Sequence, residues 1–176
     1  MRGFYADERI DGKIWPKNHL IFKYVYKYFK FKERKFLQLS SRTISLTRSG
    51  KKEIQSWNLP NLSPISIIPC CTDSTHFSKE NIIDIRSEFA LKSNDFIISY
   101  IGSLGTWYML DEMLDFFKIL WQKNNNSKFL FITKDNPEKI FDKCIKKNIS
   151  KNAILVKDSS REMIPNYIGL SNFSIF

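Results

Sequence analysis

Hydrophobic positions follow two different periods in the C-terminal half of the chain. Residues 96–101 form a short apolar run of the kind that makes a buried strand. One apolar face at helical spacing comes next, made by Leu110, Met113, Leu114, Phe117 and Trp121. Three more predicted strands, each after a segment of helical pattern, lie at 128–133, 153–156 and 173–176. Because this alternation is typical of a parallel sheet with crossover helices, we expect an α/β, Rossmann-like fold.

The N-terminal half has a more irregular pattern of shorter elements. Residues 17–37 predict a helix with a broad apolar stripe. Short strands are expected at 42–47 and 64–69, on either side of a helix at 48–57. Residues 70–91 begin with polar turn residues and end in a predicted short amphipathic helix. This half therefore predicts a small α/β region and a linker that leads into the regular sheet.

A second face of the predicted helix at 17–37 is basic. Its four cations recur at helical spacing: Lys23, Lys27, Lys30 and Arg34. Glu33 is the only acid inside this helix, so few pairs within the helix neutralise the basic ridge. The ridge suits contact with anionic lipids at the inner face of a membrane, and a solvated helix face is the other interpretation.

Composition places the chain among folded globular proteins. The 176 residues are 43% hydrophobic and 26% charged, enough to bury a core. No apolar run approaches the roughly 20 residues of a membrane span, and the first residues are polar, so neither a span nor a secretory signal is predicted. Cys70, Cys71 and Cys144 form no C-x-x-C pair, and only His19 and His76 accompany them. We therefore expect no metal site and a reducing, cytoplasmic setting.

The net charge of +10 favours a polyanionic partner, which leaves nucleic acid, an anionic membrane surface and phosphorylated substrates as candidates. The abundance of lysine, asparagine and isoleucine can also reflect an AT-rich genome, which would account for part of the charge. The sequence starts in a predicted loop and stops inside a predicted strand. We therefore expect the chain to be a piece of a larger protein.

The stretch "GSLG", from Gly102 to Gly105, separates the predicted strand at 96–101 from its helix. A loop without Cβ atoms lets backbone N–H groups approach a phosphate, and a helix N-terminus adds attraction. The other interpretation is a tight turn that needs a positive φ at Gly102. The spacing matches neither the dinucleotide-binding pattern nor the P-loop pattern, and no lysine follows the second glycine.

Four stretches, in this order, resemble glycosyltransferase family 4, whose members have two Rossmann-like domains of the GT-B type. These stretches are residues 2–16, 66–77, 98–117 and 159–176. The resemblance implies that 1–68 is the C-terminal portion of an acceptor-binding domain. It also implies an interdomain linker with a short helix at 69–94, and the N-terminal half of a donor-binding domain at 95–176.

The resemblance further implies a reaction and its participants. Such enzymes move a sugar from a nucleotide-diphosphate sugar to a glycan or lipid-linked acceptor, usually with retention of configuration and without a metal or other cofactor. The donor side is implied at Gly102 and Ser103 near the diphosphate, Lys157 and Asp158 near the base, and Lys134 as a substitute cation. Glu162 and Tyr167 are expected to cap and pack rather than react.

The acceptor side of the cleft is implied at Arg2, Asp7 and Glu8, with Asp11 beside them, and surface ion pairs are the other interpretation of this group. Trp107 and Tyr108 either shelter the cleft or pack under the following helix. Asp73 is expected to cap the linker turn, and neither His19 nor His76 is expected to be catalytic.

The chain also departs from the family pattern. Ser103 stands where the family often has arginine, no lysine follows it closely, and the family's acidic donor segment would lie beyond residue 176. We therefore expect little or no turnover from this chain alone. Two alternatives stay open: a basic nucleic-acid-binding module and a non-catalytic nucleotide-binding domain. The aromatic residues lie mainly at core spacing and no recognised nucleic-acid motif appears, so we expect no nucleic-acid partner.

Overall fold

The computed structural model describes residues 3–105 and 108–175. The chain divides into two compact units, Met1–Thr72 and Asp73–Phe176, which we call unit 1 and unit 2. The division falls after Thr72, inside the segment predicted as a linker. Arg2 and Trp107, two residues singled out above, lie outside the described part of the chain.

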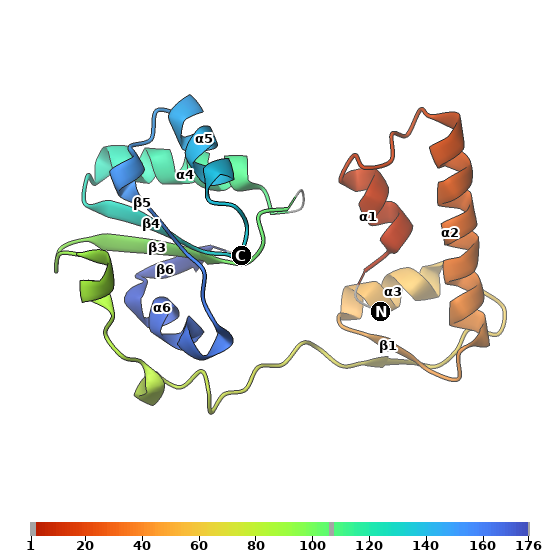
Figure 1. Cartoon of the computed structure of the whole chain (residues 1–176). Coiled ribbons are helices and arrows are strands. Elements are labelled where there is room, and N and C mark those ends of the chain that lie inside the picture. Colours follow the sequence, from red (N-terminus) through yellow and green to blue (C-terminus); the bar gives the residue numbers. More distant parts are fainter. Residues whose placement is uncertain (1–2, 106–107, 176) are drawn as a thin grey trace. The chain divides into compact units, whose positions relative to one another are not determined.

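Unit 2 is built on a four-stranded parallel sheet (Figure 1). Its strands are β3 (Phe96–Ile101), β4 (Ser127–Ile132), β5 (Ile154–Lys157) and β6 (Phe173–Ile175). Their spatial order is β5-β4-β3-β6, so the first strand in the sequence lies inside the sheet. The crossovers run through α4 (Leu110–Lys123), α5 (Glu138–Lys146) and α6 (Ile164–Leu170). The predicted parallel sheet with crossover helices is confirmed.

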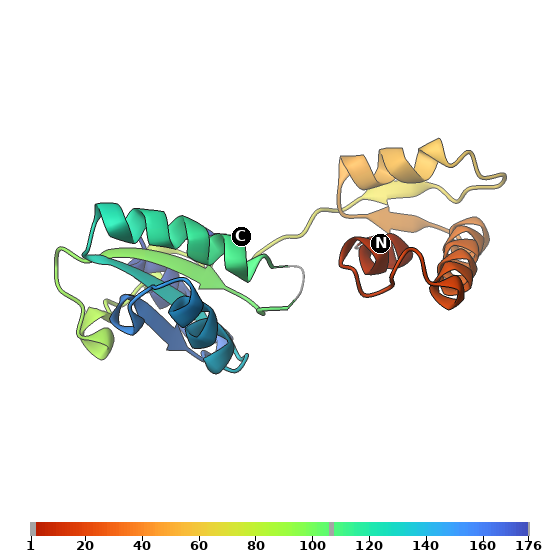
Figure 2. The same cartoon turned by 90° about the horizontal axis from the view of Figure 1, so that it is seen from above.

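Helices cover both faces of this sheet because successive strand residues point to opposite sides. Figures 1 and 2 show α4 and α5 on one face and α6 on the other. On the first face, Ile98, Phe129 and Phe131 pack against the α4 residues Leu114 and Phe117. The second face carries Ile97, Leu130 and Ile132 of the strands, with Tyr167 and Leu170 of α6. Each such buried side chain contributes about 1.5–3 kcal/mol, so the sheet and its helices form the stable body of unit 2.

The predicted amphipathic helix at 81–91 is wrong. The structure has two short 3₁₀ turns there, η1 (Lys79–Asn81) and η2 (Arg86–Phe89), with extended backbone at Ile82. The Ile83 N–H donates to Asn166 Oδ1 in α6 at 2.9 Å, so it makes a bond to a distant element instead of a helical bond. Tertiary contacts with α6 therefore replaced the local helical pattern. Two further 3₁₀ turns, η3 (Lys151–Ala153) and η4 (Arg161–Met163), precede β5 and α6.

Unit 1 contains α1 (Tyr5–Asp11), α2 (Leu20–Leu39), β1 (Thr43–Ser45), α3 (Arg48–Ser56) and β2 (Ile65–Ile67). The two strands are parallel, with α3 as their crossover, and Figure 2 shows α3 on one face of the strands. Thr47 caps α3 by accepting the Gly50 N–H at 2.9 Å. The helices and strands predicted between residues 17 and 69 are confirmed, with bounds that shift by one to three residues.

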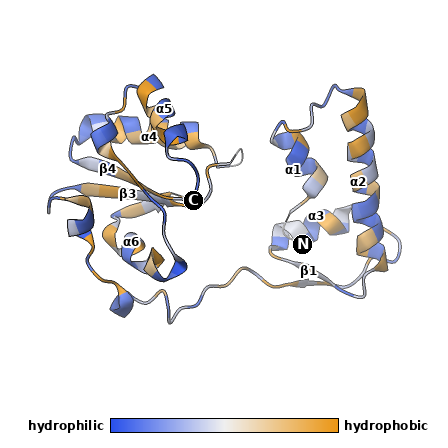
Figure 3. Cartoon of the chain, in the orientation of Figure 1, coloured by the Kyte–Doolittle hydropathy of each residue, from blue (hydrophilic) through white to orange (hydrophobic). Residues whose placement is uncertain are grey.

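Much of the apolar surface of α2 stays exposed, and Figure 3 shows hydrophobic and hydrophilic residues mixed along this helix. Its exposed large apolar residues include Leu20, Ile21, Tyr24, Tyr28, Phe31, Phe36 and Leu39. Leu37 is the buried residue of this helix. Among the described residues, no helix combines the length and the hydropathy that crossing a membrane requires.

Candidate functional site

The loops after β3, β4 and β5 surround a crevice of about 290 Å³ in unit 2. The carboxyl ends of parallel strands meet at one edge of a sheet, where ligands of such folds usually bind. The lining includes four of the residues predicted for donor binding: Gly102, Ser103, Lys134 and Asp158. Lys157 is the last residue of β5 and does not line the crevice; its carbonyl accepts the Thr133 N–H at 3.0 Å.

Glycine is required at position 102 for two reasons. Its φ of 156° is rarely adopted by residues with a side chain, and a Cβ there would lie 2.9 Å from Tyr100 Oη. The Gly102 N–H donates to the Ile132 carbonyl of β4 at 3.0 Å, so this amide belongs to the sheet. The tight-turn interpretation of Gly102 therefore describes its backbone, and the amides that can face the crevice lie further along the loop.

Tyr100 holds the loop from below. Its hydroxyl donates to the Ser103 carbonyl at 2.6 Å, and its ring is buried in the core of unit 2. Burial raises the pKa of Tyr100, with Tyr108 and Asp135 adding to the effect, so the phenol keeps the proton that it donates. A hydrogen bond from a buried, protonated side chain gives the glycine loop a defined position at the edge of the crevice.

Asp135 is a residue of the crevice that sequence reasoning missed. Its Oδ2 atom accepts two hydrogen bonds from the glycine loop, one from the Leu104 N–H and one from Ser103 Oγ at 3.1 Å. The Leu104 amide, and then the Ser103 hydroxyl, hold the pKa of Asp135 below its usual value, so the side chain is ionised at neutral pH. The only sequence signal was an acid placed just after a predicted strand.

The crevice wall has a mixed charge. Lys134 contributes a cation, whereas Asp135 and Asp158 contribute two carboxylates. Lys134 and Asp158 are exposed, and Asp135 is half-buried. Ile101, Ile132 and Ile164 supply an apolar floor. The arrangement offers a hydroxyl, a cation and acids to a polar ligand, over a surface on which a flat ring can rest.

A second cavity of unit 2, of about 840 Å³, lies between the start of α4 and α5. Four lysines line it: Lys139, Lys143, Lys146 and Lys147. Lys143 forms an ion pair with Asp111, and Lys147 pairs with Asp115 at 2.6 Å. Two of these lysines therefore neutralise acids of α4 and tie the two helices together.

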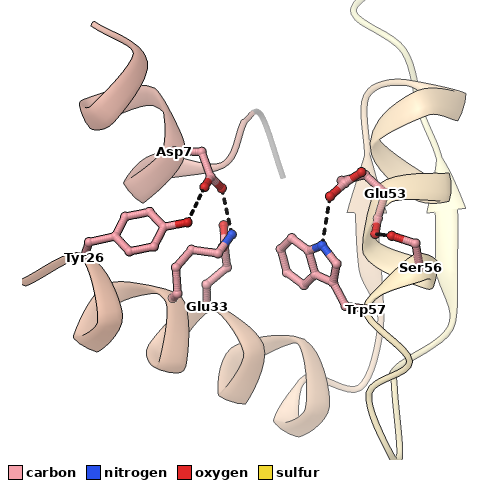
Figure 4. Close-up of polar contacts among 7 residues, drawn as sticks. Asp7, Tyr26, Glu33, Glu53, Ser56 and Trp57 are labelled. Carbon is pink, nitrogen blue, oxygen red and sulfur yellow. Dashed lines mark hydrogen bonds and ion pairs between the residues drawn. The ribbon is translucent and has the colours of Figure 1, made fainter. Parts of the chain in front are cut away.

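Unit 1 has a cavity of about 790 Å³ lined by residues of α1, α2, α3 and β1. Asp7 lies on its wall and accepts hydrogen bonds from Tyr26 Oη at 2.8 Å and Lys30 Nζ at 2.7 Å (Figure 4). Lys30 Nζ also contacts Glu33 Oε2 at 2.7 Å and lies 4.2 Å from the centre of the Trp57 ring. One ammonium group therefore joins α1, α2 and the end of α3.

The charge of Lys30 is stabilised by its partners. Burial opposes the charged form, but the hydrogen bonds to Asp7 and Glu33 outweigh it and raise the pKa of Lys30. The Trp57 indole N–H donates to Glu53 Oε1 at 3.0 Å on the other side of the cavity (Figure 4). The result is a pocket with an aromatic wall and paired charges, a surface suited to hydroxyl-rich ligands.

The predicted acceptor-side residues Asp7 and Glu8 both line this cavity, together with Asp11. The predicted basic ridge of α2 is not one continuous surface. Lys30 and Arg34 line the cavity, and the Lys30 side chain is only 14% exposed, because the acids of α1 and α2 surround its charge. Lys23 and Lys27 remain exposed. Including Lys30 in an outward-facing ridge was therefore wrong.

The remaining candidates have structural roles. Asp73 accepts the Thr75 and His76 N–H groups at 3.0 and 3.2 Å, as predicted for a turn cap. The His76 ring contacts the Arg161 carbonyl, and the His19 ring packs on Phe22. Tyr167 is buried in the core of unit 2.

Cysteine chemistry and metal binding find no support in the described residues. Cys144 is buried, which raises its pKa to about 11 and suppresses the thiolate. Cys70 and Cys71 are exposed free thiols. Within residues 3–105 and 108–175, no three or more His, Cys, Asp or Glu side chains are grouped to hold a metal ion.

The fold has counterparts among solved structures. WaaG, a glycosyltransferase involved in lipopolysaccharide biosynthesis, matches 97% of this chain and 46% of its own, with a TM-score of 0.73 and 13% identity. Sucrose-phosphate synthase from Thermosynechococcus elongatus matches 84% and 37%, with a TM-score of 0.66 and 12% identity. Anabaena HepE in complex with UDP matches 90% and 43%, with a TM-score of 0.61 and 12% identity.

Sequence comparison adds nothing to this likeness: no protein-family model matches the chain, and no curated protein matches it. The chain spans less than half the length of each of these three structures. At 12–13% identity, the likeness establishes the architecture alone. The chain therefore has the α/β fold of part of a GT-B glycosyltransferase, with parallel strands and crossover helices in both of its units.

Proposed function

We propose that this chain is part of a glycosyltransferase of the family-4 kind. In this proposal, the enzyme transfers a sugar from a nucleotide-diphosphate sugar to a glycan or lipid-linked acceptor, with retention of configuration and without a metal or cofactor. The observation that carries the proposal is the crevice at the carboxyl ends of β3, β4 and β5, in a chain with the GT-B fold. HepE was solved with UDP, and TarM was solved with UDP and fondaparinux, which supports a nucleotide donor and a glycan acceptor.

The crevice offers groups for each part of such a donor. Ser103 and Lys134 face the space where a diphosphate would lie, and a hydroxyl and a cation both stabilise a departing diphosphate. Asp158 can accept hydrogen bonds from a ribose or a base, and Lys157 stands beside it on β5. The apolar floor formed by Ile101, Ile132 and Ile164 suits the flat face of a base.

Unit 1 carries the acceptor side in this proposal. Asp7 and Glu8 line its cavity, and carboxylates bind the hydroxyl groups of sugars through paired hydrogen bonds. We assign 1–68 to an acceptor-binding domain, 69–94 to a linker and 95–176 to a donor-binding domain. Because transfer requires a donor and an acceptor held together, and the chain spans less than half of its structural counterparts, we expect little turnover from it alone.

The experiment compares this chain with a longer product of its gene, if one exists, in two assays. Calorimetry measures the binding of UDP, and release of UDP from UDP-glucose is followed with a glycan or lipid-linked acceptor. We expect weak, saturable UDP binding by the chain and transfer by the longer protein. Equal turnover by both proteins would refute the expected inactivity of this chain, and absence of nucleotide binding from both would refute the proposed function.

The net charge of +10 favours one competing function, a nucleic-acid-binding module. Random oligonucleotides distinguish the two, because binding to phosphates by a basic surface weakens steeply as salt concentration rises. Micromolar, salt-sensitive binding of oligonucleotides without UDP binding would favour this alternative. A non-catalytic nucleotide-binding domain would instead bind UDP and show no transfer even as the longer protein.

Contact with an anionic membrane belongs to the same proposal and places the enzyme at the cytoplasmic face. Lys23 and Lys27 are exposed on α2 beside the exposed rings of Tyr24, Tyr28 and Phe31. A helix face with cations and aromatic rings is typical of helices that lie in a membrane interface. Sedimentation with vesicles that contain anionic lipid, but not with neutral vesicles, is the expected result.

A further inference from the structure

The glycine loop of unit 2 already binds an anion, and this anion is a side chain of the same protein. Oδ2 of Asp135 accepts hydrogen bonds from both the Leu104 N–H and Ser103 Oγ. The Asp135 N–H donates to Thr133 Oγ1 at 3.2 Å, so the carboxylate starts from a turn that is itself ordered at the end of β4. The two donors of the loop converge on a single oxygen atom of the carboxylate.

A phosphate oxygen uses the same kind of contacts. Backbone N–H groups and hydroxyls bind carboxylates and phosphates alike through charge-assisted hydrogen bonds. The Leu104 N–H carries one hydrogen, and the Gly102 N–H is engaged with the Ile132 carbonyl. A phosphate that takes the Leu104 N–H and the Ser103 hydroxyl must therefore displace the Asp135 carboxylate from them.

Charge adds to this competition. Asp135 and Asp158 both line the crevice, and Lys134 is the cation among its lining residues. A diphosphate of about two to three negative charges would meet two carboxylates at short range, and their repulsion is only partly screened in a crevice. Removal of Asp135 would therefore release two donors and remove one repulsive charge, whereas removal of Asp158 would remove a charge only.

We propose that Asp135 occupies the phosphate position of the glycine loop, so that this carboxylate competes with a nucleoside diphosphate and sets the affinity of the crevice for it. This inference rests on the proposed function for the identity of the nucleotide. The competition itself concerns any diphosphate. Asp135 is a specificity-determining residue in this scheme, because ligands without a phosphate leave its hydrogen bonds in place.

The test measures binding by calorimetry with the full chain and three variants: Asp135→Asn, Asp135→Ala and Asp158→Asn. The probes are UDP, inorganic pyrophosphate and uridine. We expect both Asp135 variants to bind UDP and pyrophosphate about tenfold more tightly than the wild type, as expected when two charge-assisted hydrogen bonds become available. Uridine binding is expected to stay unchanged.

Asp158→Asn is the matched control, because it removes one negative charge from the same crevice. It is compared through pyrophosphate, since Asp158 is assigned to the nucleoside part of the donor. We expect a gain of about two- to threefold from charge alone. A gain equal to that of the Asp135 variants would overturn the competition, and so would unchanged affinity of both Asp135 variants.

The outcomes separate the inference from the proposed function. Tighter pyrophosphate binding by the Asp135 variants, without UDP binding by any protein, supports the competition and contradicts the nucleotide donor. UDP binding by the wild type that neither Asp135 variant improves contradicts the competition and leaves the donor in place. If no protein binds either UDP or pyrophosphate, both ideas fail. Thermal unfolding of each variant checks the fold, and two Asp135 variants guard against a folding defect in one.

Discussion

The two units of this chain share parallel strands and crossover helices but differ in what holds them together. Unit 2 has four strands with an apolar layer on each face, and its strand residues Ile97, Ile98, Phe129 and Phe131 are fully buried. Unit 1 has two short strands, and its longest helix leaves most of its large apolar residues exposed. A sheet buried on both faces stabilises itself, whereas a two-stranded sheet depends on what packs around it.

The polar residues of the two units differ in the same way. In unit 1, charges are paired with one another across helices, as Lys30 is with Asp7 and Glu33. In unit 2, the acid at the candidate site is bound by the backbone and a hydroxyl of the glycine loop. The comparison teaches that apolar burial maintains unit 2 and leaves its strand ends free for polar groups, whereas unit 1 uses its polar groups as part of its packing.

The largest expected effect tests the apolar core of unit 2. Phe117 is fully buried in α4, and the neighbouring Phe116 is 46% exposed. We expect Phe117→Ala to lower the free energy of unfolding by about 3–5 kcal/mol, because it leaves a cavity between α4 and the sheet. Phe116→Ala is the control, with an expected loss of about 1 kcal/mol or less. Urea denaturation followed by circular dichroism measures both, and equal losses would show that burial does not explain the stability of unit 2.

The next effect concerns the glycine loop. Gly102→Ala introduces a Cβ close to Tyr100 Oη at a φ that disfavours side chains, so we expect a loss of about 1–3 kcal/mol in the free energy of unfolding. A Cβ at Gly105 meets only ordinary contacts, the nearest at 3.8 Å. Gly105→Ala is therefore expected to change stability by less than about 0.5 kcal/mol. Similar losses in the two variants would contradict the conformation described for the loop.

A smaller effect tests the polar packing of unit 1. Lys30→Met removes the ammonium between Asp7 and Glu33, and we expect a loss of about 1–2 kcal/mol, because two partly buried carboxylates lose their partner. Lys27→Met changes an exposed cation of the same helix and is expected to have an effect within about 0.5 kcal/mol. If the two variants unfold at the same denaturant concentration, the Lys30 network does not stabilise unit 1.

The same network predicts a dependence on alkaline pH. The pKa of Lys30 in the folded protein is raised above its ordinary value of 10.5. Its contribution to stability is therefore fully present below about pH 10.5, and it is lost as pH rises through the higher folded value. The difference in unfolding free energy between the wild type and Lys30→Met should shrink between pH 9 and pH 12. A constant difference would mean that the charge of Lys30 does not matter.

The smallest expected effect concerns the surface of unit 2. Asp111 pairs with Lys143 across α4 and α5, which holds the pKa of Asp111 below its ordinary value of 3.8. Because the pair is exposed, Asp111→Asn is expected to cost about 0.5 kcal/mol or less at neutral pH. A lowered pKa means that this contribution exists above about pH 3.8 and disappears as pH falls through the folded value. The neighbouring substitution Glu112→Gln serves as the control in the same urea denaturation, and a loss above 1 kcal/mol would contradict the view that surface pairs contribute little.

Local pattern was sufficient for most of the elements. The apolar run at 96–101 and the helical spacing from Leu110 to Phe117 were read correctly, because burial on both faces of a sheet and on one face of a helix leaves a distinct period. The predicted N-cap of α5 at Asn136 is off by one residue: Pro137 is the cap, and Asn136 Oδ1 accepts the Glu138 N–H at 2.9 Å. The helix predicted at 81–91 failed, because a distant side chain, Asn166, takes a backbone N–H that the helix needed.

The sequence by itself determined the order of strands and helices in unit 2, and hence that the loops after β3, β4 and β5 meet at one edge of a sheet. Only the tertiary structure decided which side chains interact there. Asp135 is 31 residues from Leu104, and Lys30 is 23 residues from Asp7. Hydrophobic period is a property of neighbouring residues and is visible in the sequence. A hydrogen bond between groups so far apart depends on where the folded chain places them, and no local pattern records that.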